Sequence, residues 1–535
     1  MGGVFGGKES QAAPFAVYAA LVAHRTGRPA RLIVTKDDDM VITGKRNPFL
    51  IDYQVGFDDN GHLLALKAQL YSDGGAYADL STAIMERAML HIDNAYFIPS
   101  VEVSGQVCRT NYHPSTAFRG FGGPKGVTTI EAAIEDIARQ LGKDALEIRQ
   151  RNCYRPGHDV TPYGQTVTDN RLPELFDQLA DKCQYAKRRQ RLDEFNAAST
   201  ESVRGLAMTA VKFGIAFTTR FLNQGAALVN LHMDGTVQVS TGATEMGQGV
   251  NAKIAKVVAD VFGITPDQVS VLTTSTATIH NTSPTAASSG SDINGQAALQ
   301  AAEQIKARLQ SIARQVLSRD RKLMGRAVAG AGTTAELKVK PHPDDQHFQF
   351  GDGKVVDKTN PSRSLTLEQV IEEAYLNRVS LGEKGYYRYP GIHFNKETGA
   401  GSPFLYYTTG VAASEVQLDR FTGELKILRS DLLMDLGRPL NHGIDYGQVT
   451  GGFIQGVGWM TTENLHYDEH GRLHSHSPST YKIPGVHDIP REFNVEFLED
   501  AYCKPNLRGS KAVGEPPLLL GVSVWAAIKN AIGYV

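Results

Sequence analysis

Six times along the chain, a stretch rich in glycine or serine runs directly into a segment with the apolar spacing of a helix. These stretches are residues 2–7, 118–123, 245–249, 282–288, 446–448 and 514–517. Glycine permits positive φ and a close backbone approach to a ligand. The first N–H groups of a helix lack internal partners, and the helix dipole adds partial positive charge. Each stretch is therefore a candidate anion-binding loop. Six of them indicate one large anionic ligand held at several points, and the alternative is six ordinary turns that each need glycine.

Helical and strand patterns alternate along the rest of the chain and predict an α+β fold. Apolar residues at helical spacing from Phe15 to Val22 predict a helix that stops at Gly27, and residues 31–35 predict a strand. The dipeptides at 60–61, 234–235 and 422–423 (Asn-Gly, Asp-Gly and Thr-Gly) each lie between strand-like runs and predict hairpins.

The length of 535 residues predicts more than one domain. A charged and polar segment, residues 187–203, predicts the join between an N-terminal part (1–195) and a C-terminal part (196–535). Residues 330–364 are rich in Gly, Pro, Asp and Lys, and they predict a surface insertion. We expect two large mixed α/β subdomains with the active site at their interface, where ligand sites commonly form.

The charge balance excludes several classes of protein. A formal net charge of -2 leaves no electrostatic footprint for nucleic acid or an anionic membrane. No apolar run is long enough to cross a bilayer, and no secretory signal is present, so we expect a cytoplasmic protein.

The four cysteines (Cys108, Cys153, Cys183 and Cys503) are scattered, which disfavours a zinc or iron–sulfur site in this chain. His474 and His476 are expected to lie in a solvated turn.

The first loop also fits the opening of a phosphate-binding P-loop, with Gly2, Gly7 and Lys8 at the required spacing. Glu9, however, stands where a serine or threonine should hold magnesium, and no strand precedes the loop. A carboxylate at that place repels a triphosphate, so nucleotide hydrolysis is disfavoured.

Six sequence motifs together identify a family. They are Gly-Val-Phe-Gly-Gly-Lys-Glu at 3–9, Met-Glu-Arg at 85–87, Phe-Arg-Gly-Phe-Gly-Gly-Pro at 118–124, Glu-Met-Gly-Gln-Gly at 245–249, Thr-Ser-Pro-Thr-Ala-Ala-Ser at 282–288 and Lys-Ala-Val-Gly-Glu-Pro-Pro-Leu at 511–518. With these motifs in this order, the chain resembles the molybdenum-binding subunits of the xanthine oxidase family, the xanthine dehydrogenases among them. The resemblance covers nearly the whole chain except the segment 330–364.

The resemblance implies molybdopterin, whose sulfurs hold a molybdenum that carries oxo and sulfido ligands. It implies that the backbone of Phe5 and Gly6, with Arg119 and Ala287, lies nearest the molybdenum. It places a second group of residues around the pterin and its phosphate: Met246, Gly247, Gln248, Thr285, Ser288 and Gln448. The cofactor rather than a side-chain cage holds the metal, which agrees with the absence of a His/Cys cluster in the sequence. Iron–sulfur clusters and FAD are expected on partner chains.

Glu515 lies between Gly514 and two prolines. Pro516 restricts the Glu515 backbone toward an extended conformation, and two prolines suit the start of a helix. From the residues alone, Glu515 is either a helix N-cap or a catalytic base. The resemblance implies the base: Glu515 takes a proton from the water-derived oxygen, which attacks an electron-poor carbon next to nitrogen.

Glu9 and Arg87 distinguish between possible substrates. Without the family, Glu9 could be a first-turn glutamate and Arg87 a surface cation. The resemblance implies that this pair faces a purine: the arginine stabilises charge developing on the ring oxygen, and the carboxylate hydrogen-bonds the heterocycle. It also implies that Phe121 and Phe217 sandwich the flat ring, with Thr218 beside it. Aldehyde-oxidising relatives generally carry apolar residues in place of Glu9 and Arg87.

The function expected from these features is oxidation of hypoxanthine to xanthine and of xanthine to urate in purine catabolism, with electrons passed to iron–sulfur and flavin partners. One alternative is an aldehyde or other N-heteroaromatic hydroxylase of the same family. Another is a non-catalytic cofactor-binding assembly partner. The chain lacks the upstream part of the family's molybdenum subunit, including a glutamine near the metal. We therefore expect one of two cases. The chain is a fragment, or it is a split subunit of a hetero-oligomer in which another chain supplies the upstream part.

Overall fold

The computed structural model describes residues 9–278, 280–318, 339 and 342–535. Close contacts group the chain into two compact units, and each unit contains both helices and sheets, which confirms the predicted α+β class. Unit 1 comprises Met1–Arg220, Ala286–Ser288 and Gly391–Val535, and unit 2 comprises Phe221–Thr285 and Ser289–Pro390. The first boundary between these units follows Arg220. The subdomain boundary expected at residue 195 stays a prediction.

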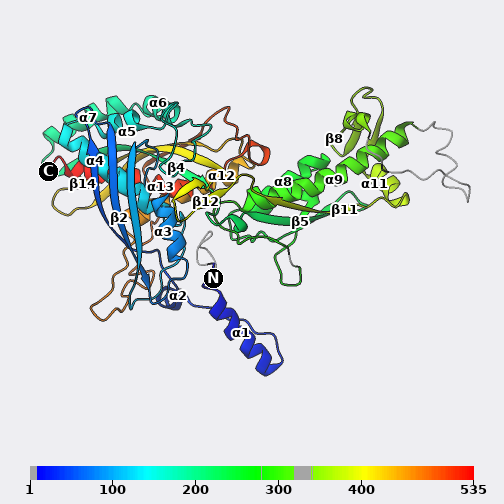
Figure 1. The fold of residues 1–535 in the computed structure, drawn as a ribbon, viewed down its shortest axis with the longest axis horizontal. Coiled ribbons are helices and arrows are strands. Elements are labelled where there is room, and N and C mark those ends of the chain that lie inside the picture. The colour runs from blue at the N-terminus through cyan, green and yellow to red at the C-terminus, as the bar shows by residue number, and fades with distance from the viewer. Residues whose placement is uncertain (1–8, 279, 319–338, 340–341) are drawn as a thin grey trace, which may run out of the picture. The chain divides into compact units, whose positions relative to one another are not determined.

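The first sheet of unit 1 contains β1 (Phe49–Phe57), β2 (Leu63–Gly75) and β3 (Ser100–Arg109) in that order. β1 runs antiparallel to β2 through the predicted Asn60-Gly61 hairpin, in which Gly61 has φ 87°. β3 runs parallel to β2 after the helix α3 (Ser81–Met89). The helix α4 (Gly123–Leu141) lies against this sheet (Figure 1).

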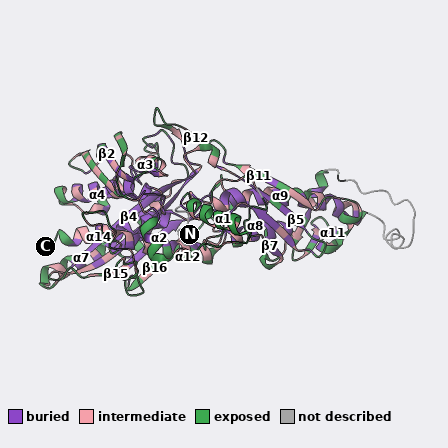
Figure 2. Ribbon diagram, turned by 90° about the horizontal axis from the view of Figure 1, so that it is seen from below, coloured by how far each residue is buried: buried purple, intermediate pink, exposed green. Residues whose placement is uncertain are grey.

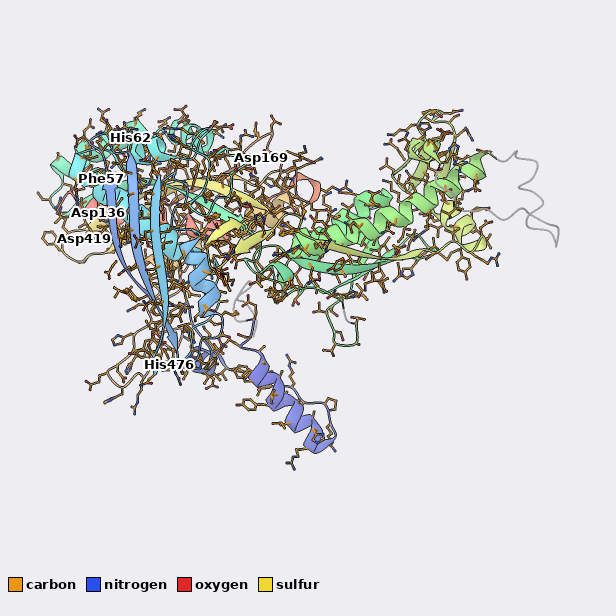
Figure 3. All side chains as sticks on the ribbon, viewed as in Figure 1. Phe57, His62, Asp136, Asp169, Asp419 and His476 are labelled. Atoms are coloured by element: carbon orange, nitrogen blue, oxygen red, sulfur yellow. The ribbon has the colours of Figure 1, made fainter. Side chains whose placement is uncertain are left out.

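Hydrogen bonds to one carboxylate on α4 tie the first sheet to the end of the chain. Asp136, labelled in Figure 3, accepts from the Tyr53 hydroxyl of β1 at 3.0 Å and from Lys529 at 2.8 Å. Lys529 belongs to the C-terminal helix α14 (Val522–Ile532). The same view labels His62 at the β1–β2 turn, where its ring nitrogen lies 2.9 Å from Asp58.

The second sheet of unit 1 has the order β16-β15-β14-β4 and forms the centre of its core. Its strands are β4 (Ser202–Ile215), β14 (Tyr406–Asp419), β15 (Leu425–Asp435) and β16 (Glu492–Phe497). β14 and β15 are joined by the predicted turn at Gly423, which has φ 73°. Most residues of β4 are buried, because helices such as α14 cover the sheet. This covering accounts for the lack of apolar–polar alternation in that strand.

The charged segment 187–203, which was predicted to join the two subdomains, contains most of a packed helix. Residues 185–198 form α7 (Tyr185–Ala198), and Leu192 on it is buried. Arg188 pairs with Glu415 at 2.9 Å and with Asp431 at 2.8 Å. The helix is held in place because its charges find partners on the neighbouring strands.

Residues 13–35 of unit 1 are mostly exposed. The predicted helix is present as α1 (Ala13–Thr26) and ends at Gly27 with φ 63°, but none of its residues is buried (Figure 2). Val17, Tyr18 and Leu21 are each more than half exposed. The strand predicted at residues 31–35 is absent: this segment has no regular structure, since no described strand pairs with it.

Unit 2 is built on a sheet of order β11-β5-β6-β7 covered by two helices. Its strands are β5 (Gln224–Leu231), β6 (Val237–Thr241), β7 (Val269–Val271) and β11 (Gly382–Arg388), and its main helices are α8 (Val250–Phe262) and α9 (Gly290–Ser318). The predicted turn at Gly235 joins β5 to β6. α9 approaches β11 so closely that a Cβ at Gly385 would lie 1.9 Å from the carbonyl oxygen of Ala297.

The described part of segment 330–364 forms short strands, and its interpretation as an insertion stays a prediction. It contains η3 (Pro343–His347), β8 (Phe348–Gly351), β9 (Lys354–Asp357) and β10 (Ser364–Thr366). Phe348 and Val355 are buried in the core of unit 2. The Gly-, Asp- and Lys-rich composition that suggested an insertion belongs to tight turns between short strands.

The remaining elements are shorter. They are α2 (Lys36–Ile42), α5 (Ala145–Asn152), α6 (Leu172–Lys182), η1 (Arg220–Leu222), η2 (Pro266–Gln268), α11 (Leu367–Leu376), β12 (His393–Asn395), β13 (Ala400–Ser402), α12 (His442–Met460), η4 (Leu507–Gly509) and α13 (Pro516–Leu519). Within the part of the chain that the structure describes, no helix is both long and apolar enough to cross a membrane.

Candidate active site

The carboxylate of Glu515 is buried and held at both oxygens. Oε1 accepts from the backbone N–H of Gly120 at 3.2 Å, and Oε2 accepts from the hydroxyl of Ser288 at 2.8 Å. The same hydroxyl accepts from the Glu515 backbone N–H at 2.9 Å. The side chain is 7% exposed. Ser288 and the Gly120 peptide thus orient a carboxylate that Pro516 and Pro517 place at the start of α13.

The backbone at Glu515 differs from the expected extended conformation. Its φ of -103° and ψ of -40° lie in the helical region, where it forms the N-cap of α13. The hydrogen bond to Ser288 accompanies this geometry, and Ser288 itself has a left-handed φ of 57°. The local rule for a residue before proline is overridden here by contacts with residues 227 positions away.

Arg119 links its own loop to Gly514 and to Gln448 on α12. Its Nε donates to the carbonyl of Gly514 at 2.5 Å, and its Nη2 donates to the backbone and side-chain oxygens of Gln448, both at 3.2 Å. Gly452 on α12 makes room for it, since a Cβ there would lie 2.9 Å from Nη2. Burial lowers the pKa of Arg119 to about 10, and the Glu515 charge opposes this fall. Arg119 therefore stays protonated and fixes Gly514, the neighbour of Glu515.

Arg46 contacts the same loop from the other side, and no sequence pattern pointed to it. Its Nη1 donates to the Arg119 carbonyl at 2.9 Å, and its guanidinium stacks over Phe118 and Trp459. It lines a cavity of about 1090 Å³, together with Lys125. Burial lowers the pKa of Arg46 to about 10, and Glu463, Tyr481 and Glu515 counteract this effect.

Phe121 lies in the loop before α4 at a left-handed φ of 46°, between Gly120 and Gly122, each with φ 92°. A Cβ at Gly122 would lie 2.0 Å from the carbonyl oxygen of Ile84, so only glycine fits there. This crowding fixes the loop from which the Gly120 N–H reaches Glu515. Phe217 and Thr218, both half-buried, follow β4. The expected sandwich of a planar ring by Phe121 and Phe217 stays a prediction.

Arg87 is buried at 3% exposure near the C-terminal end of α3 and binds the end of β4. Nη1 donates to the carbonyl of Gly214 at 2.9 Å, and Nη2 donates to the carbonyl of Ala216. Burial lowers its pKa, and Glu515 is the largest of the charges that oppose this effect. Arg87 is therefore no surface cation. It supports the backbone that leads into Phe217.

Glu9 is the first described residue and carries an unpaired carboxylate oxygen. Oε2 is buried and has no hydrogen-bond partner among the described residues. Burial raises the pKa of Glu9 from 4.5 to about 7, and the charges of Glu515 and Asp79 act in the same direction against a backbone hydrogen bond that lowers it. Glu9 and Glu515 therefore interact electrostatically, and Glu9 can carry a proton near neutral pH.

The loop 245–249 in unit 2 binds its own carboxylate, which differs from the expected open anion site. Glu245 accepts from the backbone N–H groups of Gly247 at 2.8 Å, Gly249 at 3.0 Å and Asn251 at 3.1 Å. Burial of Glu245 would raise its pKa, but these bonds outweigh burial and lower it. Gln248 also turns inward, accepting from the Met246 N–H at 2.6 Å. The Glu245 carboxylate therefore caps the N–H groups at the start of α8.

Two other predicted loops differ in part. Residues 446–448 are not a loop but part of α12, which starts at His442 with Asn441 as its N-cap. Gln448 nevertheless meets Arg119 from within that helix. Thr285 accepts from the N–H of Thr244, the residue before loop 245–249, at 2.9 Å. Phe5 and Gly6 lie outside the described residues.

The residues of unit 1 fit a cofactor that brings its own metal ligands. The described residues contain no group of three or more His, Cys, Asp or Glu side chains that could hold a metal ion. No described cysteines are disulfide-bonded to each other, and Cys153, Cys183 and Cys503 are buried. His474, near Asp468, is exposed. The Glu9 oxygen that lacks a partner among the described residues, by contrast, offers a hydrogen-bond position to a bound molecule, and Glu9 interacts electrostatically with Glu515.

Comparison with known families identifies the fold and the bound group. Two domains described as "Molybdopterin cofactor-binding domain" match residues 1–153 and residues 178–326 with 318–490. The chain belongs to the molybdopterin cofactor-binding family. The resemblance to the xanthine oxidase family that the motifs indicated is thereby confirmed, together with its mixed fold.

Curated relatives and solved structures agree with this assignment. The chain is 42% identical over 532 residues to xanthine dehydrogenase/oxidase of Mus musculus, and 38% identical over 535 residues to xanthine dehydrogenase of Dictyostelium discoideum. Each match covers 99% of this chain but 36% of the relative's length. Quinoline 2-oxidoreductase from Pseudomonas putida 86 superposes with a TM-score of 0.84 at 23% identity, over 97% of this chain and 64% of that chain. This family member therefore spans about a third of the length of these curated relatives.

Proposed function

We propose that this chain is the catalytic part of a molybdenum hydroxylase that oxidises hypoxanthine to xanthine and xanthine to urate. The observation that carries the proposal is the buried Glu515 carboxylate, held by Ser288 and the Gly120 peptide beside the buried, protonated Arg119. A helix cap alone would not need both carboxylate oxygens fixed by segments so distant in the sequence. A proton acceptor that must meet one reacting atom does need such fixing.

The chain's residues orient the substrate and move one proton. When bound, the molybdenum cofactor supplies the two-electron oxidation and activates the water oxygen that enters the product. Glu515 accepts the proton of that water, and its fixed carboxylate avoids reorganisation during the step. Arg119, Ala287, Ser288 and Gln448 would lie against the cofactor, and Met246, Gly247, Gln248 and Thr285 would contact the pterin and its phosphate. Phe5 and Gly6 would complete the surroundings of the metal.

Glu9 and Arg87 support a purine substrate over an aldehyde. Glu9, with a pKa of about 7, is part protonated at neutral pH and can donate to a ring nitrogen. Arg87, buried near the Glu515 charge, would stabilise negative charge on the ring oxygen. Phe121 and Phe217 with Thr218 would hold the planar ring. The 42% identity to a xanthine dehydrogenase/oxidase supports the same assignment.

Two other functions compete with this one. The fold is shared with quinoline 2-oxidoreductase and with aldehyde oxidoreductase from Desulfovibrio gigas, the latter at a TM-score of 0.73, so another N-heterocycle or an aldehyde is the alternative substrate. A non-catalytic assembly partner is the second alternative, and the fixed Glu515 carboxylate speaks against it.

We infer that electrons leave through iron–sulfur clusters and FAD on partner chains in the cytoplasm. The upstream part of the molybdenum subunit would come either from the same polypeptide or from another chain of a hetero-oligomer. This agrees with the 36% share of the relatives' length that the chain spans.

The proposed base is tested by Glu515→Gln in the complex purified from its native host with its partner chains. We expect normal molybdenum content and a loss of xanthine turnover of several orders of magnitude, because the amide cannot accept the proton. Near-normal turnover in a molybdenum-replete Glu515→Gln enzyme would refute the base and, with it, the catalytic assignment.

The substrate assignment is tested by Glu9→Val with Arg87→Met, assayed on xanthine and on an aromatic aldehyde. Purine turnover should fall far more than aldehyde turnover. Because Arg87 also binds the end of β4, Glu9→Val alone serves as the variant that leaves this contact intact. Equal losses on both substrates would contradict a purine-facing role for Glu9.

A further inference from the structure

Arg46 and Glu515 are bonded to opposite ends of a single peptide group. The carbonyl of that peptide belongs to Arg119 and accepts from Arg46 Nη1 at 2.9 Å. Its N–H belongs to Gly120 and donates to Glu515 Oε1 at 3.2 Å. A cation on the carbonyl polarises the peptide and makes its N–H a stronger donor, because chained hydrogen bonds reinforce one another at low dielectric.

We propose that Arg46 is a positioning residue for the proton-transfer step, acting on Glu515 through the Arg119–Gly120 peptide. Arg46 touches neither the carboxylate nor, in the proposed function, the substrate. It fixes the plane of the peptide and stabilises the ionised form of Glu515, which is the form that can accept a proton. This inference rests on the proposed role of Glu515 as the base.

The surroundings of Arg46 fit such a role better than a purely structural one. Its Nη2 is buried and has no hydrogen-bond partner among the described residues, which is a cost that a residue serving only stability would not be expected to retain. Phe118 and Trp459 hold the guanidinium plane, with its carbon 4.4 Å and 5.2 Å from the two ring centres. The cation is therefore fixed in direction and aimed at one carbonyl.

Several charged groups among the described residues act on the Glu515 carboxylate. Arg46, Arg87 and Arg119 each interact favourably with it, and Glu9 interacts unfavourably. Arg46 in turn faces Glu463, whose carboxylate accepts from the Tyr481 hydroxyl at 2.5 Å. Removing Arg46 takes away one favourable charge and weakens the Gly120 N–H donor, so the Glu515 carboxylate is held less firmly.

The test uses Arg46→Met and Arg46→Lys in the assembled enzyme with its partner chains. For Arg46→Met we expect full molybdenum content, a fall in kcat of about ten- to hundredfold with little change in KM, and an acidic limb of the pH profile displaced to higher pH. Arg46→Lys, which keeps the charge, should recover part of kcat. The infrared band of the Glu515 carboxylate, identified by its loss in Glu515→Gln, should change frequency in Arg46→Met, because the Gly120 N–H that it accepts from becomes a weaker donor.

Chemical rescue separates positioning from folding. Arg46 lines a cavity of about 1090 Å³, so methylguanidinium should enter and restore activity to Arg46→Ala. Lys125→Met is the matched control, because Lys125 is a second basic side chain on the same cavity and no hydrogen bond joins it to the Arg119–Gly120 peptide. Its pH profile should stay that of the unmodified enzyme.

The outcomes are distinguishable. An unchanged kcat and pH profile in molybdenum-replete Arg46→Met would overturn the inference, and so would loss of molybdenum from both Arg46→Met and Arg46→Lys. If Glu515→Gln is inactive while Arg46→Met is normal, only this inference fails. If Glu515→Gln is fully active, the proposed function fails first.

Discussion

Ser288 offers a direct measure of how much the fixed position of Glu515 contributes to turnover. In Ser288→Ala, Glu515 Oε2 loses a donor at 2.8 Å, and the Glu515 N–H loses its acceptor. A hydrogen bond to a charged group contributes about 1.5–3 kcal/mol. If orientation of the carboxylate is needed at the transition state, that loss corresponds to a fall in kcat of roughly 10- to 150-fold.

The assay is xanthine turnover per bound molybdenum, because Ser288 is also an expected cofactor contact. Ser288 has a left-handed φ of 57°, so Ser288→Gly removes the hydroxyl without opposing the backbone. Equal losses in Ser288→Ala and Ser288→Gly would assign the effect to the hydroxyl. Ser479→Ala, at an exposed serine, is the control for a generic loss of a hydroxyl. A turnover per molybdenum within twofold of the unmodified enzyme would refute the reasoning.

Three further changes test other parts of the structure. Glu9 has a pKa raised from 4.5 to about 7, so its contribution to stability is complete below pH 4.5 and disappears as the pH rises to about 7. Between these pH values, the free energy of unfolding should fall by up to roughly 3 kcal/mol relative to that of Glu9→Gln, as measured by thermal melting. An equal pH dependence of the two proteins would contradict this prediction. Glu245→Ala should destabilise the start of α8 by about 1 kcal/mol, measured by urea unfolding, and the difference should shrink at acid pH as Glu245 becomes protonated. Gly452→Ala would place a Cβ 2.9 Å from Arg119 Nη2, so turnover should fall although alanine favours a helix. Gly451→Ala is the control, because a Cβ at Gly451 meets no atom within 4 Å. Equal turnover of the two variants would count against the crowding argument.

Local sequence patterns correctly predicted the elements that depend only on neighbouring residues. The helix ending at Gly27 and the turns at Gly61, Gly235 and Gly423 were all found, because a positive φ is a requirement of the residue itself. The strand at 31–35 was wrong, since a strand needs a partner and its own sequence cannot supply one. The helix α7 was missed for the opposite reason: its charges pair with strands more than 200 residues away.

The candidate site shows the same division. Glu515, Arg119 and Ser288 were found through motifs, and the structure brings them together in unit 1. Arg46 stands in no recognisable pattern, because its role depends on one carbonyl 73 positions further along the chain. Glu245 was interpreted as part of an open anion-binding loop, but its own carboxylate caps the helix, which spacing alone cannot distinguish.

The uncovered helix α1 has a practical consequence for anyone producing this chain alone. Val17, Tyr18, Leu21 and Val22 present an apolar face to water, and the unpaired segment 31–35 follows directly with Ile33 71% exposed. Contiguous apolar surface next to a β-prone segment promotes association and aggregation. The isolated chain is therefore expected to aggregate in proportion to its concentration. Co-production with a chain that covers α1, or Leu21→Lys with Ile33→Lys, should keep it monodisperse.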